Sequence, residues 1–322
     1  MPKKERLRSP IGYYGGKGNL APLLSCLVPD GGKPYAEPYA GGASLFFYRD
    51  PAPVEALNDI NELVVNLFRC FQDRNTFEDL RHRISYTPYA KAEFARALEI
   101  IKKPNEADRV TLAWATFVAF NLTMSGKVKD ALPSNWSRNF LVRQGVAGTI
   151  NRWLMRLAAL DAWRWRLMLV QIDQRDALEF IRYWDNKDAV FYIDPPYHHD
   201  TRAEKDCYGY EVDDEHHRQL VEVLLDLKGA AVLSCYMHPV YEPLIDSGWQ
   251  RIDIPTACHA AGKVRASGLQ GAGAGLKKVP RVETVLRNPK AQRLKPVGKD
   301  RRIIVYEVEK SEDEPLLLLP TG

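Results

Sequence analysis

The sequence predicts an α/β fold with a doubly wound, mostly parallel sheet and an inserted helical subdomain. Three observations support this prediction. Short apolar runs rich in β-branched and aromatic residues recur along the chain, helical patterns lie between several of them, and the alternation stops in one central stretch. With 322 residues and 45% hydrophobic content, the chain is long enough to bury one large core, or a core with a smaller dependent domain.

The apolar runs have the length and composition of strands. We expect strands near residues 35–37, 54–57, 167–172, 189–193, 230–234, 249–254, 282–286 and 302–308. Helical spacing occurs between them, in a segment with Leu63, Leu67, Cys70 and Phe71 and in a segment with Leu220, Leu224, Leu225 and Leu227. Because strands and helices alternate, most neighbouring strands are expected to run parallel.

The alternation fails between about residues 71 and 165, where the pattern is one of helices and loops. We therefore expect a main domain formed by residues 1–70 and 166–310, a helical insert at 71–165 and a tail at 311–322. Three tryptophans stand among arginines in the insert: Trp153, Trp163 and Trp165. Their helical spacing favours burial in a core over stacking on nucleic-acid bases.

Cysteine usage and hydropathy restrict the class of protein. The five cysteines are far apart and form no C-x-x-C pair, which argues against a zinc site and a disulfide framework. No stretch approaches the roughly 20 apolar residues of a membrane span. We expect a soluble protein that acts without a membrane in a reducing cytoplasm, prokaryotic or phage-infected.

The net charge of +4 is unevenly distributed. Residues 262–302 hold twelve Lys and Arg against two acids, and residues 72–168 hold sixteen against nine. Two basic regions that flank a less basic body suit a polyanion held across a cleft. Solvated charged faces are the alternative interpretation.

One apolar run ends in an acid, two prolines and an aromatic residue, which are Asp194, Pro195, Pro196 and Tyr197. Open α/β sheets bind ligands at the carboxyl ends of their strands, and prolines leave rigid carbonyl acceptors there. Asp194 and the Pro195 carbonyl are placed to accept hydrogens from one exocyclic amine, while Tyr197 stacks on the ring. The alternative is an ordinary turn after a strand.

A second motif joins a short strand to a glycine turn at residues 37–42, which includes Glu37, Tyr39 and Gly41. Glycines there let a ligand approach the backbone. Asp59 ends the next strand, where its carboxylate can accept ribose hydroxyls. Nicotinamide and adenosyl ligands both fit this pattern, as does a tight turn with a capping acid.

A third motif, residues 13–19, begins with two tyrosines and contains Gly16 and Lys17. It fails as a phosphate-binding loop because Gly12 and Gly16 have one residue too few between them. Gly18 also stands where such a loop needs Ser or Thr.

Taken in order, these motifs resemble the Dam-like class of N6-adenine-specific DNA methyltransferases with the alpha-type motif order, over residues 11–288. The resemblance implies a Rossmann-like fold that binds S-adenosylmethionine, and a catalytic segment at Asp194, Pro195, Pro196 and Tyr197. It also implies cofactor contacts from both sequence segments of the main domain. These are Tyr13, Lys17, Glu37, Tyr39, Gly41, Asp59, Asp176 near the adenine, and Asp194.

The same resemblance implies double-stranded DNA as partner, a flipped adenine as target and a target-recognition role for the insert. We expect DNA contacts from two sets of residues: Lys127, Lys129, Asn135 and Arg138 in the insert, and Lys277, Lys278 and Arg281 in the C-terminal basic stretch. Residues 121–127 differ from the corresponding segment of the members that read GATC, so the recognition sequence stays open.

Two pairs of adjacent histidines occur in the sequence, and neither is expected to have a catalytic or metal-binding role. His198 and His199 precede an acid, but adjacent histidines rarely ligate one ion and no third ligand is apparent, so no metal site is expected. His216 and His217 are expected at the surface of a helix.

Rival functions remain at this stage. They are methylation of cytosine N4, whose enzymes usually have Ser in place of Asp194, methylation of an RNA base, or an inactive nucleic-acid-binding module. A nicotinamide dehydrogenase is disfavoured by the missing third glycine.

Overall fold

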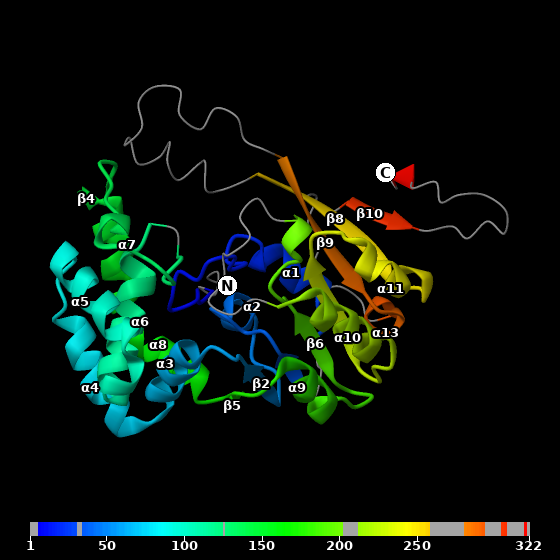
Figure 1. The fold of residues 1–322 in the computed structure, drawn as a ribbon, viewed down its shortest axis with the longest axis horizontal. Coiled ribbons are helices and arrows are strands. Elements are labelled where there is room, and N and C mark those ends of the chain that lie inside the picture. Colours follow the sequence, from blue (N-terminus) through cyan, green and yellow to red (C-terminus); the bar gives the residue numbers. More distant parts are fainter. Residues whose placement is uncertain are drawn as a thin grey trace, which may run out of the picture.

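The computed structural model describes residues 6–30, 34–124, 126–201, 212–257, 280–293, 304–307 and 319–320 (Figure 1). Within these ranges, the side chains of residues 256–257, 280–281, 293, 304–307 and 319–320 are not described. The predicted DNA contacts Lys277 and Lys278, and most of the predicted tail, therefore lie outside the described residues. For Arg281 only the backbone is described.

A nine-stranded sheet with the order β11-β10-β8-β9-β7-β6-β1-β2-β5 organises the molecule. Five neighbouring strands are parallel: β5 (Gln171–Asp173), β2 (Glu55–Asn58), β1 (Tyr35–Glu37), β6 (Val190–Ile193) and β7 (Ala230–Cys235). Four more continue it in antiparallel pairings: β9 (Pro280–Arg287), β8 (Gln250–Ala257), β10 (Ile304–Glu307) and β11 (Leu319–Pro320). The predicted doubly wound, mostly parallel sheet is confirmed.

Helices cover both faces of this sheet, because successive strand residues point to opposite sides. Tyr35 packs in one apolar cluster and Ala36 in another. The first cluster includes residues of α1 (Ala21–Leu27), α2 (Ser44–Tyr48), α3 (Glu62–Gln72) and α13 (Pro289–Arg293). The second includes residues of α9 (Ala177–Trp184), α10 (Asp214–Leu225) and α11 (Glu242–Asp246).

The stretch between α3 and β5 is mainly helical and lies to one side of the sheet (Figure 1). It holds α4 (Arg74–Ser85), α5 (Lys91–Lys102), α6 (Arg109–Leu122), α7 (Gly148–Leu157), α8 (Leu160–Leu167) and a small hairpin of β3 (Val142–Arg143) and β4 (Val146–Ala147). Short 3₁₀ turns lie at Pro104–Glu106, Pro133–Asn135, His199–Thr201 and Pro239–Tyr241. Helix α6 is buried on nearly all sides, as a central helix must be.

Two expectations for this region are corrected. The strand expected at 167–172 is only Gln171–Asp173, because Leu167 ends α8 and a short apolar run does not distinguish a buried helix end from a strand. Trp153 and Trp163 are buried, but Trp165 is 66% exposed on the opposite side of α8. Among the described residues, no helix combines the length and the apolar character needed to cross a membrane.

A buried ion pair fastens α8 to the sheet. Arg166 donates from both terminal nitrogens to the Glu55 carboxylate, at 2.5 and 2.7 Å, and to the Phe46 carbonyl at 3.1 Å. Its guanidinium lies 3.6 Å from the centroid of the Phe46 ring. Glu55 is buried in β2 and also accepts the Ala52 amide at 3.1 Å, but among the described residues its paired countercharge is Arg166.

Replacing Arg166 with Met should therefore destabilise the protein by about 3–5 kcal/mol, since a buried carboxylate loses its countercharge. Urea denaturation followed by circular dichroism measures this change. The double variant Arg166→Met/Glu55→Leu should regain much of the loss, whereas Arg182→Met on exposed α9 surface is the control. Equal stability of the Arg166 and Arg182 variants would contradict this role.

Candidate active site

The site lies where the strand order of the sheet reverses. After β1 the chain continues to β2 on one side, whereas β6 pairs with β1 on the other side. At such a point the loops after neighbouring strands separate and leave a crevice at the carboxyl ends. A cavity of about 280 Å³ occupies this position. Its wall includes residues 13–17, 37–45, 58–60, 175–177 and 194–196, with Tyr192, Val212 and His216.

The glycine turn after β1 is held by Asp59. The Gly41 amide donates to Asp59 Oδ2 at 2.6 Å, and the Asn61 amide donates to Oδ1 at 2.8 Å. Gly41 has φ of +47°, and a Cβ there would lie 3.1 Å from the Tyr13 ring. Glycine is required at this position because both the backbone and the aromatic ring exclude a side chain. Asp59 thus shapes the cavity and also borders it.

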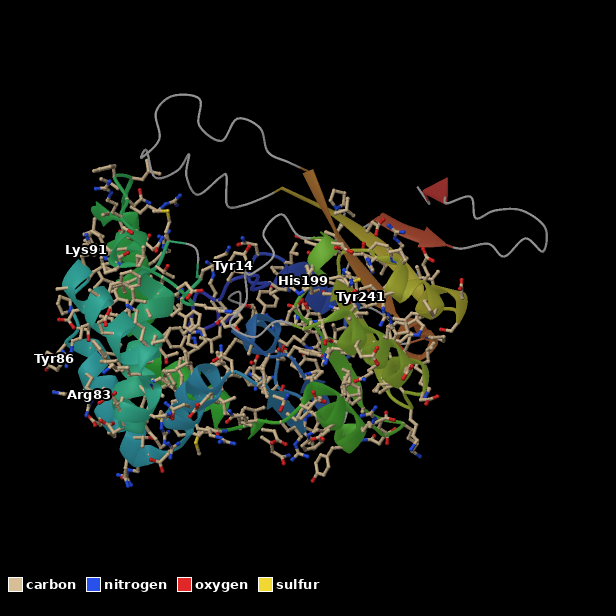
Figure 2. All side chains as sticks on the ribbon, viewed as in Figure 1. Tyr14, Arg83, Tyr86, Lys91, His199 and Tyr241 are labelled. Atoms are coloured by element: carbon tan, nitrogen blue, oxygen red, sulfur yellow. The ribbon has the colours of Figure 1, made fainter. Side chains whose placement is uncertain are left out.

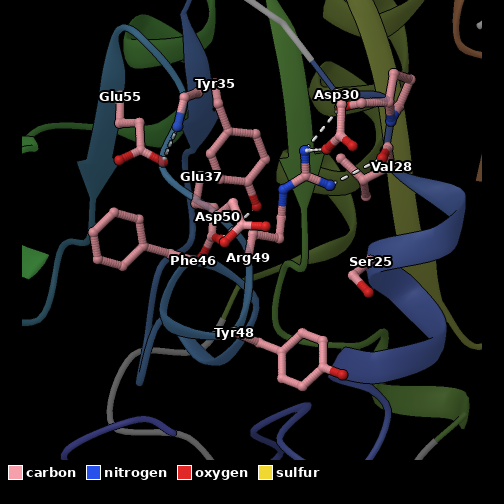
Figure 3. Close-up of polar contacts among 12 residues, drawn as sticks. Ser25, Val28, Asp30, Tyr35, Glu37, Phe46, Tyr48, Arg49, Asp50 and Glu55 are labelled. Carbon is pink, nitrogen blue, oxygen red and sulfur yellow. Dashed lines mark hydrogen bonds and ion pairs between the residues drawn. The ribbon is translucent and has the colours of Figure 1, made fainter. Parts of the chain in front are cut away.

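Glu37 ends β1 and is buried at the base of the cavity. The Tyr35 hydroxyl donates to Glu37 Oε1 at 2.6 Å (Figure 3). Burial raises the pKa of Glu37 to about 8, although the Tyr35 hydrogen bond opposes the shift. The nearby Arg49 is directed to the carbonyls of Val28 and Pro29 and to Asp30. A cationic ligand group in the cavity would lower the cost of ionising Glu37.

Asp194 follows β6 directly and is paired with Lys17. The Lys17 ammonium donates to Asp194 Oδ1 at 2.8 Å and to the Gly15 carbonyl at 3.2 Å. Burial raises the pKa of Asp194, and the charge and hydrogen bond of Lys17 oppose that rise. Lys17, expected as a cofactor contact, therefore lines the cavity and also favours the ionised, hydrogen-accepting form of Asp194.

Glu283 belongs to the same charge network, and the sequence interpretation missed it. Its carboxylate lies 3.6 Å from the Lys17 ammonium and accepts the Tyr197 hydroxyl. Burial and the neighbouring Asp194 raise its pKa, while Lys17 lowers it. Glu283 lies near the start of antiparallel β9, so a search restricted to the carboxyl ends of parallel strands could not find it.

Tyr197 has a different place from the one expected. Asp194, Pro195 and Pro196 line the cavity, whereas the Tyr197 ring is 5% exposed and packs edge-on against Tyr236 with centroids 4.5 Å apart. The Lys17 ammonium lies 4.6 Å from the centre of the Tyr197 ring. In this arrangement Tyr197 packs behind the part of the chain that lines the cavity, and the expected stacking on a base requires its side chain to rotate.

Asp176 and Tyr39 complete the set of predicted cofactor residues at the cavity. Asp176 Oδ1 caps α9 by accepting the Leu178 and Glu179 amides, at 2.9 and 3.1 Å. The Tyr39 hydroxyl lies 2.7 Å from His216 Nε2. Tyr13, Lys17, Glu37, Tyr39, Gly41, Asp59, Asp176 and Asp194 all line one cavity.

The histidine expectations need correction. His216 borders the cavity, and His217 is fully buried, where the Tyr241 hydroxyl lies 2.9 Å from its Nδ1. Helix α10 packs on the sheet, so the two residues are not both exposed. A pair of neighbouring histidines in the sequence does not indicate which side of a helix is buried.

A third possible ligand beside His198 also exists. Ligand atoms of His198, Asp200 and His238 lie within 4.8 Å of one another, and the two imidazole rings are stacked with centroids 3.6 Å apart. His238 follows β7, which pairs with β6. The pairing of these strands brings His238 close to His198, although the two residues are far apart in the sequence.

The predicted DNA contacts of the insert divide into two groups. Lys127 and Lys129 line a second cavity, of about 350 Å³, which shares Tyr13 and Tyr14 with the first. The Lys127 ammonium lies 4.5 Å from the centre of the Tyr14 ring, which is situated between the insert and the sheet (Figure 2).

Two other insert residues, Asn135 and Arg138, are exposed and line neither cavity. Asn135 Oδ1 accepts the Leu132 amide at 2.8 Å and so closes a turn. The structure thus brings Lys127 and Lys129 toward the first cavity, and leaves Asn135 and Arg138 on the outer surface of the insert.

Removing the Lys17 ammonium by Lys17→Met should raise the pKa of Asp194 further, because burial would then act without its main opposing charge. Carboxyl ¹³C NMR titration of the free protein measures this shift. Lys17→Arg keeps a cation beside Asp194, so the pKa of Asp194 should stay close to its wild-type value. An Asp194 pKa that is the same in the wild type and in Lys17→Met would remove Lys17 from this role.

The comparisons with known proteins agree with this arrangement. The family model for D12 class N6 adenine-specific DNA methyltransferases matches residues 13–242, from the Tyr13 loop through Asp194 to α11. A Type II methyltransferase, M1.LlaDCHI from Lactococcus lactis subsp. cremoris, is 37% identical over 71 residues, which are 22% of this chain and 24% of that relative. The chain matches about a quarter of the length of this curated relative. From the family match over most of its length, the chain belongs to the D12 class of N6 adenine-specific DNA methyltransferases.

Proposed function

We propose that this protein transfers a methyl group from S-adenosylmethionine to N6 of an adenine flipped out of double-stranded DNA. One observation carries the proposal. Asp194 opens, at the end of β6, onto the same cavity that the glycine turn and Asp59 form on the β1 and β2 side. Family membership supports the adenine target over cytosine N4 or an RNA base.

The chemistry of the cavity wall suits S-adenosylmethionine. Each carboxylate oxygen of Asp59 accepts one backbone amide, and its remaining lone pairs can accept hydrogen bonds from ribose hydroxyls. Glu37 offers a buried carboxylate for a cationic end, and Asp176 borders the far end of the cavity. When bound, S-adenosylmethionine supplies an activated methyl group on a sulfonium centre. The protein's part is to hold donor and acceptor in line.

On the acceptor side, Asp194 would orient the amine. Asp194 Oδ2 and the Pro195 carbonyl accept the two amine hydrogens, which aims the nitrogen lone pair at the donor. Lys17, on Oδ1, opposes the effect of burial and favours the ionised form of Asp194, which accepts hydrogen bonds. Asp194 does not need to be a strong base, because the amine can release its proton after the new bond forms.

DNA would be held by charged groups outside this cavity, with phosphate contacts for affinity and insert side chains for sequence. Lys127 and Lys129 are insert residues that border a cavity also lined by Tyr13 and Tyr14 of the cofactor loop. Lys277, Lys278 and Arg281 remain proposed phosphate contacts on the basis of charge, and Asn135 and Arg138 remain proposed contacts that set the DNA sequence. The insert lies to one side of the sheet (Figure 1), an arrangement that suits a duplex placed across the carboxyl edge of the sheet.

The direct test is to incubate the protein with labelled S-adenosylmethionine and mixed-sequence duplex DNA, and to identify the modified nucleoside. We expect N6-methyladenine. Asp194→Ala should abolish transfer while circular dichroism stays unchanged, and Asp194→Asn should retain a trace because its amide oxygen still accepts. Asp200→Ala, an exposed acid nearby, is the control. N4-methylcytosine as the product, no methylated DNA, or normal turnover by Asp194→Ala would each refute the proposal.

The pKa of Glu37 predicts a pH dependence of cofactor binding. Below about pH 8 the free protein holds Glu37 protonated, whereas a cationic ligand favours the carboxylate, so binding releases a proton. Affinity should therefore rise with pH up to about 8, by at most tenfold per unit, and then level off. Glu37→Gln, which still accepts from Tyr35, should lose this dependence in calorimetry. Identical pH profiles of the two proteins would exclude Glu37 as the titrating group.

A further inference from the structure

Three arginines from two separate segments gather between the insert and the cofactor loop. Arg152 and Arg156 are one helical turn apart on α7, and Arg8 precedes the Tyr13 loop. The backbone of Arg8 is fixed there, because the Trp163 indole donates to its carbonyl at 2.7 Å. Burial, together with the charges of Arg152 and Arg8, lowers the pKa of Arg156 to about 10. These like charges oppose one another in the free protein.

Several arginines near the cluster are paired with acids, whereas in the described part of the chain the three arginines of the cluster are not. Arg166 is paired with Glu55, and Arg81 and Arg83 with acids of their own helix. Within residues 6–30, 34–124, 126–201, 212–257 and 280–293, no side chain forms an ion pair or hydrogen bond with the guanidinium groups of Arg8, Arg152 and Arg156. Arg156 is partly buried, whereas Arg8 and Arg152 are exposed, so the cluster presents neighbouring cations that an anion in solution can reach.

The position of Arg156 connects the cluster to the active site. A Cβ on Gly12 would lie 3.8 Å from Arg156 Nη2 and 3.0 Å from the Phe120 carbonyl, so the guanidinium group lies beside the Gly12 backbone. Gly12 precedes Tyr13, whose ring stacks on Phe120 with centroids 5.3 Å apart and borders the cofactor cavity. An anion held by Arg156 would therefore lie one residue away from the wall of the active site.

We infer that Arg8, Arg152 and Arg156 form a phosphate site for the DNA backbone, which fixes the strand beside the cofactor loop. This inference rests on the proposed function, since it assigns the same duplex a point of attachment. Guanidinium groups bind phosphate through paired, charge-assisted hydrogen bonds, and three of them match one or two adjacent backbone phosphates. Phosphate contacts carry no base information, so the site sets the position of the strand and leaves sequence choice to other residues.

The test compares DNA binding by Arg156→Gln, Arg152→Gln/Arg156→Gln and the wild type, using fluorescence anisotropy with duplexes of several sequences over a range of salt. The log-log salt slope should fall in magnitude by about 0.9 for the single variant and about 1.8 for the double variant, equally for all sequences. Arg156→Lys should keep most of the slope. Arg74→Gln, an exposed arginine at the start of α4 and away from α7 in Figure 1, should leave it unchanged.

If the three arginines instead stabilised the fold, Arg156→Gln would lower the unfolding temperature. Because the three cations repel one another, Arg156→Gln should unfold at the same temperature as the wild type or a higher one, and S-adenosylmethionine affinity should be unchanged. Lower thermal stability, or an unaltered salt slope, would overturn the inference. Wild-type stabilisation by inorganic phosphate with unaltered DNA binding by the variants would indicate a free-anion site and also overturn it. Binding is measured without turnover, so a wild type that binds DNA but does not methylate it refutes only the proposed function.

Discussion

The reversal of strand order between β1 and β6 is the constraint on which the site depends. Because these two strands are parallel neighbours, Glu37 and Asp194 emerge side by side from the same edge of the sheet. Two buried carboxylates there are unfavourable without a cation. Lys17, carried by a loop from the beginning of the chain, supplies that cation to Asp194. The N-terminal loop is therefore part of the electrostatic balance of the sheet edge.

The same loop joins the sheet to the helical insert. Tyr13 stacks on Phe120 at the end of α6, and the Asn121 side chain donates to the Pro10 carbonyl at 2.9 Å. Trp163 fixes Arg8 in the same way. The N-terminal loop is therefore packed against the insert and, through Lys17, is also paired with Asp194.

The sheet and the cavity could be predicted from sequence because their signals are local. Three features each follow a strand and therefore lie at the carboxyl edge of the sheet. They are Asp194 with its two prolines, the glycine turn, and the acid after the next strand. Because ligands bind where the strand order reverses at this edge, the three features are expected to share one cavity. Glu283 could not be found in this way, since it enters on an antiparallel strand. The burial of His217 and the stacking of His238 on His198 depend on packing between elements distant in sequence, which periodicity does not encode.

Gly126 illustrates how closely the insert is fitted to the rest of the protein. It has φ of +78°, and a Cβ there would lie 2.1 Å from the Gly12 carbonyl and 3.0 Å from the Tyr14 amide. No side chain can be accommodated at that point without moving one backbone away from the other. Replacing the loop around Gly126 would thus require an N-terminal segment that matches the new loop. In this fold the two segments have to be exchanged together.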